Sequence, residues 1–209
     1  MAAQDTKVQT RAKGQATADR VRAAAMKRFA QAGYAAVSMR EIASDVGVRP
    51  GALYNHFQTK QDILNDLMLG HMAQLLDAWE TADFPDHMDA LERFVRFHVR
   101  YHLERADEVF ISYMELRNLE PDNFETIETE RRKYEAILTE ILEKGAQDGR
   151  YTPEHPKVTT RAIIAMLTGI PAWFRESGPL SKSDIEDHYV NLVQNAVLRA
   201  PGQSPRETG

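Results

Sequence analysis

Residues 38–57 contain the side chains with the clearest chemical pattern in the chain. The spacing of their apolar residues predicts two short helices joined by a turn, with one face of the pair directed inward. The opposite face then presents hydrogen-bond donors and no carboxylate, and its members are Arg40, Arg49, Ala52, Tyr54, Asn55 and His56. Such a face can donate hydrogen bonds to the phosphates and base edges of a nucleic acid.

A helix-turn-helix would position this face. Ser38-Met39-Arg40-Glu41 has the spacing of a capping box, which predicts that the first helix begins here. The two helices must cross closely, and the turn needs a residue that tolerates positive φ; Ala43 and Gly47 meet these needs at the usual separation of four positions. The underside would be sealed by apolar residues, namely Ile42, Val46, Val48, Leu53 and Phe57.

The run SMREIASDVGVRPGALYNHFQTKQDIL resembles the signature of the TetR family of bacterial transcriptional repressors, and the strong match covers about residues 17–66. Upstream, Phe29 and Gly33 stand at places familiar from the first helix of that family. The resemblance implies a dimer whose two recognition helices enter successive major grooves of a palindromic operator. It also implies that a small ligand bound in a larger domain pulls the two motifs out of register.

By residue, the resemblance assigns Tyr54, His56 and Lys60 to phosphates. Candidates for base or groove contacts are Arg40, Arg49, Ala52 and Asn55, and Ser38, Pro50 and Gly51 complete the predicted DNA-binding set. In the alternative interpretation, Tyr54 and His56 only pack at the helix end. Position 49 departs from the family pattern, because Arg stands where many members carry Ser or Thr, the residues that would cap the recognition helix.

The charge distribution agrees with one end of the chain meeting a polyanion. The 209 residues have a formal net charge of −5, but residues 1–60 contain ten Lys and Arg against four Asp and Glu, whereas the remainder is acidic. Lys7, Arg11 and Lys13 could extend this basic region as an arm that reaches a neighbouring groove. A merely solvated tail is the alternative for these three residues.

Almost every periodic segment predicts a helix, and no stretch alternates with period two, so the expected fold class is all-α. We expect a disordered basic tail at 1–16, a DNA-binding domain at 17–62, a helical ligand-binding and dimerisation domain at 63–200, and a disordered tail at 201–209. Beyond the helix-turn-helix, helices are predicted from residue 63 to about 79 and at about 86–104, 106–118, 122–148, 156–174 and 182–199.

Aromatic and cationic residues recur along three consecutive predicted helices of the second domain. The series consists of Phe94, His98 and Tyr101, then Phe110, Tyr113 and Arg117, then Arg131 and Tyr134. An arginine on an apolar stripe must find a partner or face a polar cavity, so this pattern indicates a pocket for a partly apolar, anionic ligand. The alternative is that these arginines pair with glutamates such as Glu115 or Glu128.

A second resemblance concerns the stretch MLTGIPAWFRESGPLSKSDIEDHYVNLV. It is similar to the C-terminal part of the TetR-family branch that responds to acyl-coenzyme A thioesters in lipid, steroid or aromatic-acid breakdown. This resemblance adds Trp173, Phe174 and Arg175 to the predicted ligand residues, together with Ile170 just before them. Trp173 and Phe174 would instead pack at a dimer interface in the alternative interpretation.

Two apolar helix faces near the C-terminus predict a homodimer built as a four-helix bundle around a two-fold axis. The residues assigned to this interface are Ile163, Leu167, Ile185, Tyr189, Leu192, Val193 and Val197.

Other classes of function find little support in the sequence. The chain has no cysteine, and although His98 and His102 are spaced i, i+4, the pattern demands no third ligand, so no metal and no cofactor are predicted. No membrane span, leader peptide or nucleophile motif is recognisable, which favours a cytoplasmic protein that is not an enzyme. Two alternatives remain: a TetR-like efflux-pump regulator sensing an uncharged or cationic compound, and a helical enzyme or binding protein with a basic head.

Overall fold

The computed structural model describes residues 2–198, with side chains from residue 14 onward. Within this range all regular elements are helices, apart from one isolated β-bridge between Tyr151 and Leu198, which confirms the all-α prediction. The helices are α1 (Ala2–Ala32), α2 (Met39–Val46), α3 (Pro50–Tyr54), α4 (Lys60–Thr81), α5 (Ala90–Glu104), α6 (Ala106–Met114), the 3-10 helix η1 (Leu116–Asn118), α7 (Pro121–Gln147), α8 (Pro156–Thr168), α9 (Ile170–Trp173) and α10 (Lys182–Val197).

The chain divides into two compact units. Unit 1 comprises Met1–Gln74 and Asp107–Glu130, and unit 2 comprises Leu75–Ala106 and Arg131–Gly209. The expected boundary near residue 62 therefore differs from the observed division, because residues 107–130 join the DNA-binding head. The reason is packing, since Ile111 and Ile127 are buried in the same hydrophobic core as the helix-turn-helix.

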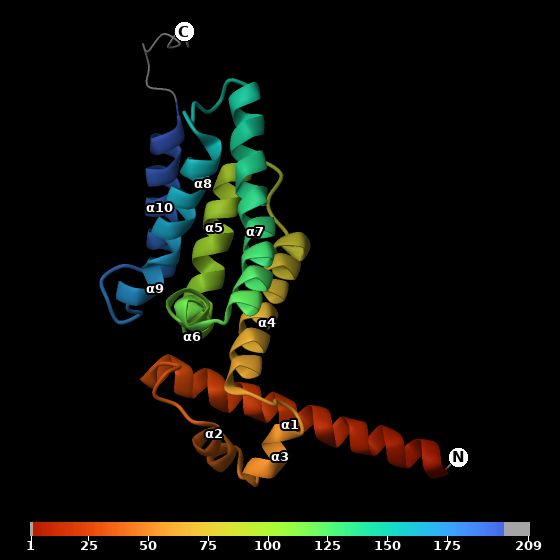
Figure 1. The fold of residues 1–209 in the computed structure, drawn as a ribbon. Coiled ribbons are helices and arrows are strands. Elements are labelled where there is room, and N and C mark those ends of the chain that lie inside the picture. The colour runs from red at the N-terminus through yellow and green to blue at the C-terminus, as the bar shows by residue number, and fades with distance from the viewer. Residues whose placement is uncertain (1, 199–209) are drawn as a thin grey trace. The chain divides into compact units, whose positions relative to one another are not determined.

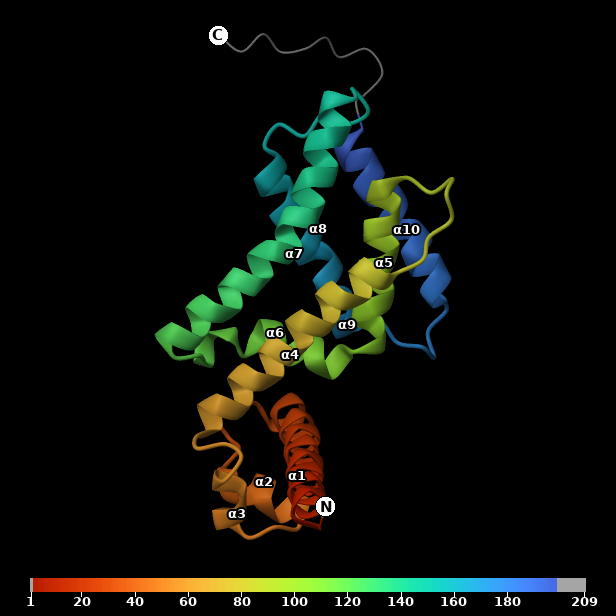
Figure 2. The same cartoon turned by 90° about the vertical axis from the view of Figure 1, so that its right-hand side faces the viewer.

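The core of unit 1 lies between α1, α2, α3 and the first part of α4, and Figure 2 shows the first three side by side. Four of the five residues expected to seal the helix-turn-helix are buried, and Val48 is half-buried against them. On α1 the buried positions are three or four residues apart, as an amphipathic helix requires: Ala18, Val21, Ala25 and Phe29.

Helix α1 begins far earlier than the sequence indicated. Residues 2–16, expected to form a disordered tail, continue the helix of residues 17–32 without a break. The segment is rich in Ala, Gln and Lys, which favour helix, and it contains no proline to stop it. The tail expected at 201–209 lies outside the described residues.

In unit 2, α5 packs against α10 and α8, and Figure 1 shows these three helices running alongside one another. The predicted helix at 156–174 is divided into α8 and α9 in the structure. Pro171 has no N–H with which to continue the α8 hydrogen-bond ladder, so the chain ends α8 at Thr168 and restarts with proline in its first turn. The other predicted helices of this part agree with the observed ones within a few residues at each end.

Candidate nucleic-acid interface

The helix-turn-helix has the local geometry that its sequence predicts. The Ser38 hydroxyl accepts from the Glu41 backbone N–H at 3.3 Å, while the Ser38 N–H donates to the Glu41 carboxylate at 2.8 Å, so the capping box is complete. At the other end of α2, Gly47 adopts φ of 72°, the left-handed conformation that favours glycine. These two devices fix where α2 begins and where the turn to α3 starts.

Helix α3, the recognition helix, begins without a capping side chain. Arg49 occupies the N-cap position and makes no side-chain cap hydrogen bond. Pro50 follows in the first turn, where its missing N–H needs no partner and its fixed φ suits a helix. The replacement of Ser or Thr by Arg at position 49 thus leaves an exposed cation at the start of this helix.

The outer surface of α2 and α3, which we call the recognition face, presents the predicted residues to solvent. Arg40, Arg49, Pro50, Gly51 and Asn55 are exposed, as is Tyr54, whose residue surface is 49% accessible. Ala52 and His56 are half-buried, and Ser38 is exposed at the N-cap of α2. Every one of these side chains comes from one short stretch of chain and offers no negative charge.

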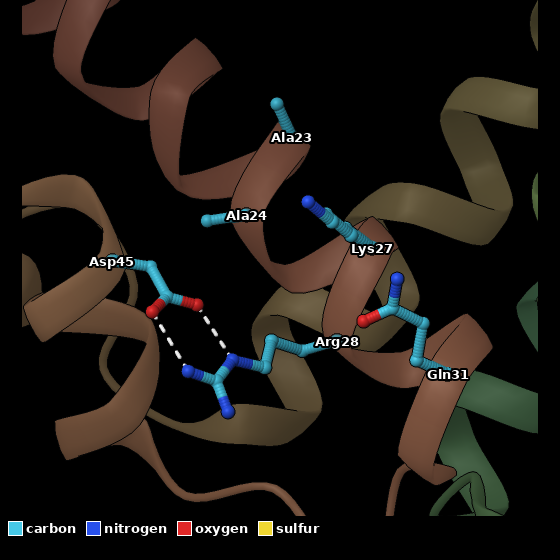
Figure 3. Close-up of a pocket in the computed structure, with 6 residues that line it drawn as sticks. All are labelled: Ala23, Ala24, Lys27, Arg28, Gln31 and Asp45. Atoms are coloured by element: carbon cyan, nitrogen blue, oxygen red, sulfur yellow. Dashed lines mark hydrogen bonds and ion pairs between the residues drawn. The ribbon is translucent and has the colours of Figure 1, made fainter.

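The two carboxylates of α2 are held by partners within unit 1. Arg28 of α1 donates two hydrogen bonds to Asp45, at 2.6 and 2.7 Å, and Figure 3 shows this pair among the residues that line a shallow depression of about 530 Å³. The hydrogen bond from Arg28 lowers the pKa of Asp45, and those from Ser38 lower the pKa of Glu41. Folding therefore favours the ionised form of both acids, and the ion pair with Arg28 limits the repulsion of phosphates by Asp45.

Lys60 occupies a different environment from the one that the resemblance implied. Its ammonium donates to the carbonyls of Tyr34 and Val37 at 2.8 and 2.7 Å and lies 4.1 Å from the centre of the Tyr34 ring. Burial lowers the pKa of Lys60. Two of its three hydrogens are used inside the protein, so Lys60 holds the loop between α1 and α2. One hydrogen is left to donate, and the phosphate contact of Lys60 stays a prediction.

Lys60 belongs to a polar cluster that we call the loop anchor, made of Tyr34, Lys60, Gln61, Glu115 and Asn118. Glu115, only 5% exposed, accepts from the Tyr34 N–H at 3.1 Å and from the Asn118 amide. The Gln61 amide donates to the Tyr34 hydroxyl at 3.0 Å and to the Asn118 carbonyl. The anchor ties the start of the helix-turn-helix to η1.

Sequence reasoning missed Tyr34, Gln61, Glu115 and Asn118. Tyr34 and Glu115 are 81 positions apart, and no periodic signal links them. Glu115 was considered only as an alternative partner for an arginine, but its carboxylate accepts hydrogen bonds from Tyr34 and Asn118. Gly33, with φ of 79°, ends α1 directly before Tyr34 and was recognisable as a helix stop.

The predicted ligand residues divide between the two units. In unit 2, Phe94, His98, Tyr101 and Tyr134 are buried, and Phe94 lies 5.3 Å from Tyr134 between ring centres. Ile170 is also buried there, Arg131 and Phe174 are half-buried, and Trp173 and Arg175 are exposed. In unit 1, Phe110 and Arg117 are exposed and Tyr113 is half-buried.

A histidine lies at the centre of the unit 2 residues, which we call the aromatic–histidine cluster. One ring nitrogen of His98 is 3.2 Å from the Tyr134 hydroxyl and the other is 3.1 Å from the Thr168 hydroxyl. The His102 ring stacks on His98 with 3.7 Å between centres. Among residues 14–198, no group of three or more His, Asp or Glu side chains is arranged to hold a metal ion.

The predicted dimer residues mostly pack inside their own protomer. Ile163, Leu167, Ile185, Val193 and Val197 are buried, Tyr189 is half-buried, and Leu192 is 44% exposed. Other small or apolar residues of α8 and α10 are exposed, namely Val158, Ala162, Ala165 and Ala196. Helices α8 and α10 form where the sequence predicted helices. Most of the apolar positions that they expose, however, are not the ones that the sequence assigned to a dimer interface.

No helix in the described part of the chain has the length and hydropathy needed to cross a bilayer.

Comparisons with known proteins point to one family for both parts of the chain. Residues 21–67 match the model of bacterial regulatory proteins of the tetR family, and residues 85–197 match that of the tetracyclin repressor-like C-terminal domain. The repressor KstR2 of Mycolicibacterium smegmatis is 26% identical over 183 residues, which cover 83% of this chain and 87% of KstR2.

Two solved structures extend the likeness to the fold. A tetR-family regulatory protein from Rhodococcus RHA1 is 33% identical with a TM-score of 0.81, and the match covers 88% of this chain and 98% of that one. AibR, solved in complex with isovaleryl coenzyme A and operator DNA, is 26% identical with a TM-score of 0.71 over 83% of this chain and 97% of its own. The chain therefore belongs to the TetR family of bacterial transcriptional regulators, which are DNA-binding proteins and not enzymes.

Proposed function

We propose that this protein is a homodimeric repressor that binds a palindromic operator and is released by an anionic, partly apolar effector. The effector we propose is an acyl-coenzyme A thioester from lipid, steroid or aromatic-acid catabolism. A repressor of chromosomal genes would act in the cytoplasm. The observation that carries the proposal is the recognition face, where donor side chains are exposed while the carboxylates of α2 are engaged elsewhere.

The proposed DNA contacts follow from exposure and chemistry. Tyr54 and Asn55 are exposed side chains at the end of α3, and Arg40 and Arg49 flank the turn as cations. A guanidinium can donate two hydrogen bonds to guanine or neutralise a phosphate, and an amide can pair with adenine. We therefore assign Arg49 and Asn55 to the major groove and Tyr54 to the phosphate backbone.

The proposed dimer uses the outward faces of α8 and α10. Leu192 is 44% exposed and Val158 65% exposed, and exposed alanines lie on the same two helices. Small side chains allow two helices to approach closely, and an apolar helix pair from each protomer can form a four-helix bundle. A palindromic operator requires such a two-fold arrangement, in which the same surface of each copy meets the other.

The dimer is tested by introducing a charge into this surface. Leu192→Glu should give monomers in sedimentation velocity and lose binding to the palindrome, because a carboxylate would be buried in the interface. Ser183→Glu is the matched control, since residue 183 is exposed near the start of α10 and about half a helical turn away around its axis. A Leu192→Glu protein that remains dimeric would refute this interface.

The effector proposal rests on the chemistry of unit 2 together with two relatives. The aromatic–histidine cluster combines the polar groups of His98, Tyr134 and Thr168 with buried aromatic and apolar side chains, a mixture that suits a partly apolar ligand. Arg131 and Arg175 supply cations in the same unit. AibR was solved with isovaleryl coenzyme A, and we extend that ligand class to this protein.

A mobility-shift assay on the DNA flanking the gene, titrated with coenzyme A thioesters, the free acids and coenzyme A alone, tests the function. We expect release by one class of thioester and not by coenzyme A alone. Arg131→Ala should keep operator binding but lose the response. Release only by uncharged or cationic compounds would instead support an efflux-pump regulator, and no shift with any flanking DNA would overturn the repressor.

A further inference from the structure

A groove of about 910 Å³, which we call the head groove, is formed by residues of unit 1. Its walls come from residues 19–31 of α1, residues 66–74 of α4 and the first turn of α6. Its volume falls in the range of pockets that hold drug-sized molecules, about 300–1,000 Å³. All of its lining residues lie outside the recognition face and the aromatic–histidine cluster, so the head groove is separate from both sites.

Gly70 leaves room for a bulky group beside α4. It lies near the middle of this helix, where glycine is less favourable than alanine for helix stability. A β-carbon added at Gly70 would meet no heavy atom within 4 Å outside its own stretch of helix. Met26, Leu67 and Leu69 line the same groove. The head groove therefore combines open space with apolar surface.

The charges around the head groove are unequal. Its charged side chains are four carboxylates and two cations, namely Asp19, Asp66, Asp107, Glu108, Arg22 and Lys27. With histidine counted as neutral, four negative charges against two positive ones leave an excess of two negative charges. A concave surface with such an excess attracts cations.

The excess is concentrated at the α6 end of the groove. Arg22 donates to Asp66 at 2.6 and 3.2 Å and to Asp19 at 2.7 Å, so these three groups neutralise one another in large part. Asp107 is exposed in the first turn of α6, and Glu108 beside it lies 3.4 Å from the ring of the buried His71. The two acids of α6 are therefore the ones placed to meet an incoming cation.

We propose that the head groove binds a small organic cation with an apolar body. The charge of this ligand lies near Asp107 and Glu108, and its body lies along Gly70 and Met26. The complementarity of charge favours a cation over an anion, and the apolar lining favours a cation with a hydrophobic part over a bare ion. This site differs from the proposed effector site of unit 2 in its place in the chain and in the sign of the charge that it takes.

The probe for this site is rhodamine 6G, a fluorescent organic cation, and its control is fluorescein, an anion built on the same ring system. Fluorescence anisotropy near 0.1 M salt measures binding to the full chain, without DNA or thioester. Tetraphenylphosphonium, a cation of different shape, serves as a competitor. We expect saturable binding of rhodamine 6G, displacement by tetraphenylphosphonium, and binding of fluorescein that is weaker by about 10-fold or more.

A substitution at Gly70 tests whether the dye occupies the groove. Gly70→Leu should weaken rhodamine 6G binding by about 10-fold or more, because the new side chain takes the place of the ligand. Gly70→Ala is the matched control, since it favours the helix in the same way but adds only one carbon, and it should change the affinity by less than about two-fold. Circular dichroism should show a thermal midpoint at or above that of the unaltered protein in both variants.

Substitutions of the α6 acids test the charge. Asp107→Asn and Glu108→Gln should each weaken rhodamine 6G binding by about 2- to 5-fold, as expected for one partly exposed ion pair. Asp122→Asn is the matched control, because Asp122 is also an exposed acid in the first turn of a helix, α7, and its affinity for the dye should equal that of the unaltered protein.

Three results would overturn the proposal: no saturable binding of either cation, binding of fluorescein as tight as that of rhodamine 6G, or unchanged affinity in both Gly70→Leu and the Asp107→Asn, Glu108→Gln double variant. Binding of an oligolysine peptide but of neither small cation would also overturn it and would indicate a basic protein segment. Failure of the operator or thioester experiments would leave this site unaffected, because neither DNA nor thioester is present in the dye measurement.

Discussion

Unit 1 keeps its recognition face exposed and uses buried polar groups to hold a loop, whereas unit 2 encloses its polar groups in an aromatic core. In unit 1, Glu115 and Lys60 bind the backbone between α1 and α2. In unit 2, His98 bridges Tyr134 and Thr168. The buried polar groups of unit 1 therefore position an outer surface, while those of unit 2 bind one another inside the core.

The largest expected change in stability comes from Phe94→Ala, which tests whether the aromatic–histidine cluster is a packed core. Phe94 is fully buried, with ring centres 5.3 Å from Tyr134 and 5.5 Å from Trp79. Phe94→Ala should lower the free energy of unfolding by about 3–5 kcal/mol, because it removes a large buried ring and leaves a cavity. Urea unfolding followed by circular dichroism measures this change.

Phe124→Ala is the control for Phe94→Ala, because Phe124 is 40% exposed and its loss should cost less than about 1.5 kcal/mol. If Phe94→Ala lowered the unfolding free energy only slightly but abolished the response to effector, the view of the aromatic–histidine cluster as a packed core would be wrong. That result would show that the ring lines a ligand cavity and contributes little to packing.

The second-largest expected change in stability comes from a substitution in the loop anchor. Glu115→Ala leaves the Tyr34 N–H and the Asn118 amide without their acceptor in a buried site, which should cost about 2–3 kcal/mol. Glu125, an exposed acid of α7, gives the control Glu125→Ala, expected within about 0.5 kcal/mol of the unaltered protein. Operator affinity measured at a temperature where the variant is folded should also fall, because the loop that leads into α2 loses its support.

The sequence was informative where a structure depends on neighbours in the chain. Ser38 and Glu41 are three positions apart, and Gly47 follows α2 directly, so the capping box and the turn were both predictable. The anchor joins Tyr34 to Glu115 across 81 positions, and its formation depends on how α1 and η1 pack. No local pattern could indicate it.

Exposure was harder to predict than helix position. The apolar residues of α8 and α10 were identified as one set, although Val193 is buried and its neighbour Leu192 is 44% exposed. An apolar stripe shows that a helix is packed, but it does not tell whether the partner is the same chain or another copy. Likewise, Lys60 was assigned to phosphate by resemblance alone, and its contacts to two backbone carbonyls depend on tertiary packing.

The different environments of Lys60 and Tyr54 lead to a third prediction. Lys60→Ala should reduce the free energy of unfolding by about 1–2 kcal/mol, because two carbonyls lose a charged donor in a half-buried site. Tyr54→Ala should leave stability within about 0.5 kcal/mol, because Tyr54 is 49% exposed, and should weaken operator binding. Thermal unfolding and salt-dependent binding separate the two effects. A salt slope reduced by Lys60→Ala with stability intact would contradict the structural role and support a phosphate contact.

The smallest expected change in stability concerns the capping box, a motif that both units contain. Ser38 begins α2 and Ser181 begins α10, each within a complete capping box closed by an acid three residues later. Ser38→Ala and Ser181→Ala should each cost about 1 kcal/mol in unfolding free energy, the usual loss for an N-cap serine. Only Ser38→Ala should also weaken operator binding, because its helix belongs to the recognition face. Equal losses of operator binding in both variants would remove the functional distinction between the units.

The same two caps should respond to acid in the same direction. Hydrogen bonds from Ser38 lower the pKa of Glu41 below its ordinary 4.5, and those from Ser181 lower the pKa of Asp184 below 3.8. A carboxylate whose pKa is lowered by folding stabilises the protein above its unfolded pKa, and this contribution is lost as the pH falls through the folded value. The difference in thermal midpoint between the unaltered protein and Glu41→Gln should therefore be constant above about pH 5.5 and shrink below about pH 4.5. Asp184→Asn should behave alike at slightly lower pH, and a difference that grows on acidification would show that neither acid is held by its cap.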